Sequence, residues 1–84
     1  MERRIAVVSI IVENPDSVEK INGILHENSE YIIGRMGLPY RQHGLSIICV
    51  VLDAPQDMIS KVSGRLGMLP GINVKTIHSK VLND

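Results

Sequence analysis

The sequence predicts an α+β sandwich with the element order β-α-β-β-α-β. The first supporting observation is an internal repeat, because a shift of 40 residues places IAVVSIIVENP (residues 5–15) over LSIICVVLDAP (residues 45–55). The second is that apolar residues at helical spacing follow each of these runs. The third is a further β-branched segment after each helical segment. Two similar strand-turn-helix units, each followed by a strand, account for all three.

Both helices are predicted from capping residues as well as from spacing. The first is expected from Asn14, a good N-cap, through Pro15 at the first helical position to about Asn28, with an apolar stripe at Val18, Ile21 and Leu25. The second is expected to begin at Pro55 and to end near Gly67, with a stripe at Met58, Ile59, Val62 and Leu66. The two stripes occupy corresponding places in the repeat.

The second and fourth strands are expected over residues 31–38 and 72–80. A short link near residues 41–44 predicts a hairpin between the second and third strands. This order is that of a ferredoxin-like sandwich, in which both helices cover one face of a four-stranded antiparallel sheet and the first and third strands are central. Residues that fit a strand ladder poorly fall on the predicted edge strands: Gly34, Gly37, Pro39 and Asn73.

Length and composition predict one domain, residues 1–84, with an aliphatic core, since the chain has neither Phe nor Trp. Nine basic and nine acidic side chains give a formal charge of zero, which argues against direct binding to nucleic acid. A single cysteine, Cys49, cannot form an intrachain disulfide, so the expected compartment is the cytoplasm. No apolar run approaches the roughly 18 residues that span a bilayer, so no membrane association is expected.

The two central strands are apolar on both faces, whereas a half-exposed antiparallel strand should alternate apolar and polar residues. The helices can cover only one face. Burying an aliphatic side chain is worth about 1.5–3 kcal/mol, so the uncovered residues favour a homo-oligomer, a dimer or a tetramer, packed through the free sheet face. The alternative is that residues 81–82 fold over that face.

Four segments resemble a known family: IIVENPDSVEKIN, YIIGRMGLPYR, KVSGRLGMLPG and INVKT. Together they are similar to the small proposed regulators of iron-only hydrogenase systems, a family with an ACT-like ferredoxin fold, over residues 4–75. The resemblance implies a cytoplasmic regulatory protein of anaerobic metabolism, with no catalytic residues to carry over. The fold is also similar to the ligand-sensing domain of nickel-responsive repressors, whose DNA-binding arm this chain lacks.

The candidate ligand site lies in the second strand and the turn after it, at Gly34, Arg35, Gly37, Tyr40 and Arg41. Arg35 and Arg41 could bracket a small anion such as a carboxylate or phosphate at a subunit boundary, with Tyr40 as a wall. Strand alternation places Ile33, Arg35 and Gly37 on one face, and Ile32, Gly34, Met36 and Leu38 on the other. The structural alternative is that the two glycines let an edge strand bend or let a neighbouring subunit pack closely.

Other kinds of site are less well supported by the sequence. Amino-acid binding at the first strand-to-helix loop is disfavoured, because Glu13, Asp16 and a proline stand there. His26, His43, His78 and Cys49 form no recognised metal-ligand set, and Cys49 is expected as a small core residue equivalent to Ser9. No catalytic motif and no cofactor site is evident, an iron–sulfur cluster included, since one cysteine cannot supply four thiolates.

These observations favour a non-enzymatic, homo-oligomeric regulatory module that binds a small ligand or a protein partner. Two alternatives remain open. One is a structural or adaptor subunit for a maturation or regulatory complex, and the other is a metal-sensing domain whose ligands come together between subunits.

Overall fold

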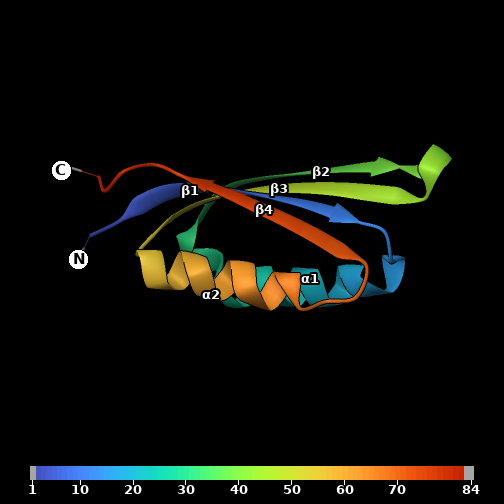
Figure 1. Cartoon of the computed structure of the whole chain (residues 1–84), viewed down its shortest axis with the longest axis horizontal. Coiled ribbons are helices and arrows are strands. Elements are labelled where there is room, and N and C mark those ends of the chain that lie inside the picture. Colours follow the sequence, from blue (N-terminus) through green and yellow to red (C-terminus); the bar gives the residue numbers. More distant parts are fainter. Residues whose placement is uncertain (1, 83–84) are drawn as a thin grey trace.

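The structure, a computed structural model, describes residues 2–82 and has the predicted order of elements. Strands and helices follow as β1 (Arg4–Val12), α1 (Val18–Glu27), β2 (Ile32–Tyr40), β3 (Leu45–Ala54), α2 (Gln56–Gly67) and β4 (Ile72–His78). Short 3-10 helices link them at η1 (Pro15–Ser17), η2 (Ser29–Tyr31) and η3 (Arg41–His43). Figure 1 shows both helices on one side of the sheet and no described element on the other.

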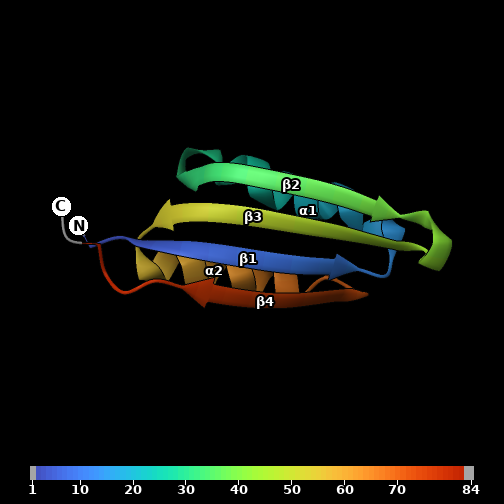
Figure 2. The same ribbon diagram turned by 90° about the horizontal axis from the view of Figure 1, so that it is seen from above.

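The sheet has the strand order β2-β3-β1-β4, with every neighbouring pair antiparallel. The ferredoxin-like prediction is therefore confirmed: β1 and β3 are central, and β2 and β4 are edges (Figure 2). β1 and β3 pair without a register shift, from Arg4 opposite Ala54 to Val12 opposite Ser46. The β2–β3 hairpin extends past the end of this pairing, so its tip projects beyond the helices (Figure 1).

The core lies between the helices and one face of the central strands. Alternate residues of β1 and β3 point into it, and the helices present the stripes that the sequence predicts. Its buried members are Ala6, Val8, Ile10, Val12, Ile21, Ile24, Leu25, Ile48, Val50, Leu52, Ala54, Ile59, Val62 and Leu66. Because these residues are small or aliphatic, two helices are enough to cover one face of the sheet.

The first turn before α1 is a tighter type of helix than the sequence predicts. The Asn14 side chain accepts a hydrogen bond from the Asp16 backbone N–H at 3.0 Å, as a capping residue should. The turn that starts at Pro15 is a 3-10 helix, and α-helical geometry begins only at Val18. The helix ends at Glu27, one residue before the expected Asn28.

A close contact between two loops explains the tight start. Gly71, in the turn before β4, has φ +68°, and a Cβ there would lie 2.5 Å from the Asn14 Cβ. The Glu13 N–H donates to the Gly71 carbonyl at 2.8 Å, and the Ser17 hydroxyl donates to the Pro70 carbonyl at 2.8 Å. The first strand-to-helix loop is thus filled by the turn that leads into β4.

A β-bulge changes the pattern of β2. Ile32 pairs with Leu52 and Gly34 with Val51, which leaves Ile33 without a partner residue in the ladder. The extra residue places Ile32 on the helix side together with Arg35, so the expected placement of Ile32 beside Gly34 was wrong. β2 also runs to Tyr40 rather than to residue 38, and β4 ends at His78 rather than at residue 80.

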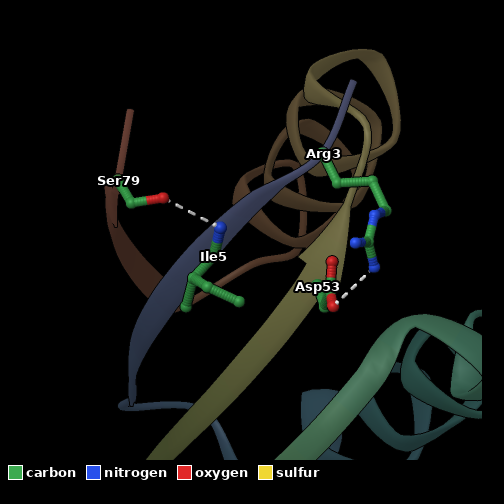
Figure 3. Close-up of polar contacts among 4 residues, drawn as sticks. All are labelled: Arg3, Ile5, Asp53 and Ser79. Carbon is green, nitrogen blue, oxygen red and sulfur yellow. Dashed lines mark hydrogen bonds and ion pairs between the residues drawn. The ribbon is translucent and has the colours of Figure 1, made fainter. Parts of the chain in front are cut away.

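The segment after β4 continues along the edge of β1. The Ser79 N–H donates to the Ile5 carbonyl at 2.8 Å, and the Leu82 N–H donates to the Arg3 carbonyl at 2.8 Å. The Ser79 hydroxyl also accepts a hydrogen bond from the Ile5 N–H at 3.1 Å (Figure 3). Residues 79–82 therefore extend the sheet edge and do not cover the free face.

Candidate functional site

The face of the sheet away from the helices, called the open face here, carries the side chains that alternate with the core residues. It consists of Ile5, Val7, Ser9 and Ile11 in β1, Gly34, Met36, Leu38 and Tyr40 in β2, Leu45, Ile47, Cys49, Val51 and Asp53 in β3, and Asn73, Lys75 and Ile77 in β4. Several apolar members are strongly exposed: Ile77 by 74%, Met36 by 60% and Leu38 by 54%. An apolar surface of this extent is typical of an interaction site.

Cys49 lies at the centre of the open face. It pairs directly with Ser9 in β1 and with Met36 in β2, and Ser9 in turn pairs with Lys75 in β4. The expected equivalence of Cys49 and Ser9 therefore appears as a direct cross-strand pair. The expectation that Cys49 fills the core was wrong, because it is a half-buried thiol on the side without helices.

One end of the open face carries an ion pair. Asp53, which pairs with Ile5 at the start of β1, accepts a hydrogen bond from the Arg3 guanidinium at 3.0 Å through Oδ2 (Figure 3). Its other oxygen, Oδ1, is buried and has no hydrogen-bond partner among the described residues. A buried carboxylate oxygen without a partner is costly, so this end of the sheet is less stable than the ion pair alone would suggest.

The five predicted site residues do not share one face. Gly34 and Tyr40 are on the open face, and Arg35 and Gly37 are on the helix side. Arg41 lies in η3, beyond the end of β2. The predicted opposition of Arg35 and Met36 across the strand is confirmed.

Arg35 reaches α1 and separates two hollows between that helix and the edge strand. Its guanidinium Nη2 donates to the Asn22 Oδ1 at 2.7 Å. On one side a hollow of about 490 Å³ is lined by Asn22, Leu25, His26, Ser29, Ile32 and Arg35. On the other side a hollow of about 250 Å³ includes Asn22, Arg35 and Gly37 in its wall. Arg35 thus lines both hollows, with its guanidinium held at Asn22, a residue that the two hollows share.

Tyr40 and Arg41 belong to the hairpin tip. The Tyr40 ring lies 5.1 Å from the His43 ring, centroid to centroid, at an interplanar angle of 32°. Arg41 lies six positions after Arg35, a span of about 20 Å for extended chain at 3.3 Å per residue. One chain therefore does not bring these two arginines together around a small anion, and a site that brackets an anion between subunits stays a prediction.

A third hollow, of about 480 Å³, lies between the two helices and includes Lys20, Glu27 and Arg65. The Arg65 guanidinium donates to the Glu27 carboxylate at 2.7 Å. This hydrogen bond, and then the positive charge of Arg65, lower the pKa of Glu27 below its usual value of 4.5. Arg65 and Glu27 thus neutralise each other, and Lys20 is the charged residue of this hollow that has no ion-pair partner among the described residues.

Residues 2–82 provide neither a cluster of metal ligands nor a membrane-spanning helix. No three His, Cys, Asp or Glu side chains in this range lie close enough together to hold a metal ion. No helix within it is long and apolar enough to cross a membrane.

Sequence reasoning missed two of these features. The first is Asn22, which holds Arg35, and the second is the unpartnered oxygen of Asp53. The internal repeat held a signal for the first, because Asn22 corresponds to Ser63 in the second helix, and both side chains bond to an edge strand.

The strand order and the two helices define the class of protein, a ferredoxin-like, ACT-like α+β domain with one open sheet face. A family model described as "TM1266-like: Iron-only hydrogenase system regulator, putative" matches residues 4–76. The chain belongs to this family, so the resemblance inferred from the four sequence segments is confirmed. The family description is that of a regulator and names no reaction.

Solved structures give the same picture. The uncharacterized protein TM1266 from Thermotoga maritima is 36% identical and has a TM-score of 0.89, over 94% of this chain and 100% of its own. A formyltetrahydrofolate deformylase from Pseudomonas putida KT2440 is 16% identical with a TM-score of 0.59, over 88% of this chain and 28% of its own. The second likeness shows the fold alone. A comparison with curated protein sequences gives no match.

Proposed function

We propose that this chain is a non-enzymatic regulatory module of an iron-only hydrogenase system, that it works as a homo-oligomer packed through the open face, and that it binds a small ligand. The family description supports the regulatory role. The observation that carries the proposal is the open face itself, where apolar residues of β1, β2 and β4 remain exposed, Ile11 by 42% and Leu38 by 54% among them, and those of β3 are half-buried.

The size of the open face fits a second copy of the chain. Four strands about 4.8 Å apart and seven residues long at about 3.3 Å each give a projected area of roughly 450 Å². The accessible area is larger because side chains project from the plane, and a stable interface buries roughly 800 Å² per partner. Two flat sheets packing face to face at about 10 Å would bury it on both sides.

Charge also favours a second copy over a charged partner. The rows of the open face hold one basic residue, Lys75, and one acidic residue, Asp53. A surface with balanced charges can meet itself without repulsion.

Sedimentation equilibrium tests the assembly. At about 10 μM, where a complex with a Kd of about 1 μM is largely formed, the wild type should sediment as a multiple of 9.3 kDa. Leu38→Glu places a charge among the exposed apolar residues of β2 that the interface would bury, and should give a monomer. Ser60→Glu, at an exposed position of α2, is the matched control and should leave the mass unchanged.

A wild-type protein that sediments as a single 9.3 kDa species would overturn the proposed assembly. So would a Leu38→Glu variant that keeps its oligomeric mass, because the apolar rows would then lie outside the interface. Circular dichroism of the same samples separates loss of assembly from loss of fold.

A further inference from the structure

The two halves of the chain differ most at their edge strands. Val7 and Ile47 are equivalent in the repeat, and their edge partners are Ile77 and Leu38. Equivalent residues of β2 and β4 therefore differ by 39 in number. On this basis Arg35 corresponds to Val74 and Gly37 to Thr76, while Asn22 in α1 corresponds to Ser63 in α2.

The second half is closed at this place. Val74 is partly buried against the core, and the hydroxyls of Thr76 and Ser63 share a hydrogen bond of 2.8 Å between β4 and α2. Helix and edge strand are in direct contact there. No hollow among those described in the molecule lies between α2 and β4.

The first half keeps the polar bridge but leaves space around it. The bond between Arg35 and Asn22 at 2.7 Å takes the place of the pair of hydroxyls, and hollows of about 490 and 250 Å³ flank it. Arg35 takes the place of Val74 in the other half, and Gly37 takes the place of Thr76. The second half of the chain thus serves as a comparison, because there the equivalent helix and edge strand pack together without any of the described hollows between them.

The larger hollow has the chemical character of a small ligand site. Its apolar wall comes from Leu25 and Ile32, and its polar groups come from His26, Ser29 and Arg35. No Asp or Glu lines it. Within the described chain, no carboxylate lies within ion-pair distance of Arg35, and only one of the guanidinium's several donors is engaged, by Asn22. A mostly apolar hollow with a few convergent polar groups is the usual form of such a site.

We infer that the hollow between α1 and β2 beside Arg35 binds a small organic anion, with its carboxylate on the Arg35 guanidinium and a short apolar body against Leu25 and Ile32. This inference deepens the proposed function, since it names the class of ligand that the regulatory module takes. Arginine suits this task because its planar donors match a carboxylate. The smaller hollow beyond Asn22 is not assigned a ligand, because it offers fewer polar side chains.

Titration of the ¹⁵N-labelled full chain with 3-methylbutanoate, followed by amide chemical shifts, tests the inference. We expect saturable shifts at Ser29, Ile32 and Arg35 with a Kd of about 1 mM or below. The neutral isostere 3-methylbutanamide should bind at least about tenfold more weakly, because it lacks the charge that the guanidinium pairs with.

Two variants that copy the second half provide the controls. Arg35→Val should weaken binding of 3-methylbutanoate by at least about tenfold, because it removes the charged donor. Gly37→Thr adds its side chain toward the smaller hollow, where a Cβ meets nothing within 4 Å, and should leave binding unchanged. A third variant, Arg35→Lys, keeps the charge without the planar fork and should bind with intermediate affinity.

The inference is wrong if the carboxylate produces no saturable shifts, if the amide binds equally well, or if Arg35→Val binds as the wild type does. Loss of binding in Gly37→Thr would also overturn it, by placing the ligand in the other hollow. Sedimentation of the same samples separates the two proposals, since the hollow and the open face lie on opposite sides of the sheet. An oligomer without binding contradicts this inference alone, and a monomer that binds contradicts the assembly alone.

Discussion

The two faces of the sheet carry nearly the same kind of side chain in very different surroundings. Ile10 and Ile11 are neighbours in β1, yet Ile10 is fully buried under the helices and Ile11 is 42% exposed on the open face. The difference arises from connectivity, because each helix returns to the same side of the sheet in this topology. Apolar side chains on both sides of a strand thus predict that both faces of the sheet are buried. The order of helices and strands decides which of the two faces is buried within the chain itself.

The sharpest test of this comparison is to truncate the two neighbours. Ile10→Ala should lower the free energy of unfolding by about 2–5 kcal/mol, because it leaves a cavity in the core. Ile11→Ala should cost less, about 1 kcal/mol in dilute protein, because 42% of this residue is exposed there and little of a cavity is left behind. Urea denaturation at several protein concentrations measures both.

The concentration dependence makes the test specific. If the open face assembles, the loss of unfolding free energy caused by Ile11→Ala should grow as protein concentration rises. The difference between the losses caused by Ile10→Ala and by Ile11→Ala should therefore shrink. Equal costs for the two variants at high dilution would mean that the faces do not differ as described.

A second prediction concerns the loops that hold the helices to the covered face. Gly71→Ala should destabilise the fold through its left-handed backbone, worth about 1–2 kcal/mol, and further through the contact of the new Cβ with Asn14, 2.5 Å from its Cβ and 2.9 Å from its backbone nitrogen. Gly44→Ala is the matched control, because its φ is +64° with open space around the added atom.

Thermal and urea unfolding of the two glycine variants should therefore differ, with Gly71→Ala the less stable. Gly44 lies at the hairpin tip beyond the helices, so its substitution should leave the covered face intact. Equal destabilisation would show that the packing of the two loops contributes nothing beyond backbone strain.

The smallest expected effect is the pH dependence of the ion pair between the helices. Arg65 lowers the folded-state pKa of Glu27, so the stabilisation is present above the unfolded pKa and is lost as pH falls through the folded value. Glu27→Gln should have a slightly lower Tm than the wild type at pH 7, and the gap should close below pH 4.5, the usual value. A gap that persists at pH 2–3 would assign the difference to something other than this ionisation.

Much of the fold could be predicted because the relevant signals are local or repeated. Asn14, Pro15 and Pro55 mark where the helices start. The shift of 40 residues identifies the two central strands as equivalent members of a repeat. The division of β2 into Arg35 on one side and Met36 on the other also followed from simple alternation.

The features that escaped prediction depend on single residues or on register. The bulge at Ile33 inserts one residue that no periodicity reveals, and it moved Ile32 to the other face. The bond between Arg35 and Asn22 joins residues 13 positions apart whose proximity depends on how β2 lies over α1. Cys49 was misplaced because apolar residues stand on both sides of β3, so composition could not tell which side the helices take.

The pair formed by Ser9 and Cys49 has a consequence for the origin of the molecule. These residues occupy equivalent places in the two halves and face each other directly, and the pairs on either side of them, Val8 with Val50 and Ile10 with Ile48, exchange places under the same equivalence. The centre of the sheet is therefore a point of local two-fold symmetry. A peptide of half the length, pairing with its own copy about that point, would reproduce the same ladder, so gene duplication and fusion could have built the domain from a once-separate dimer.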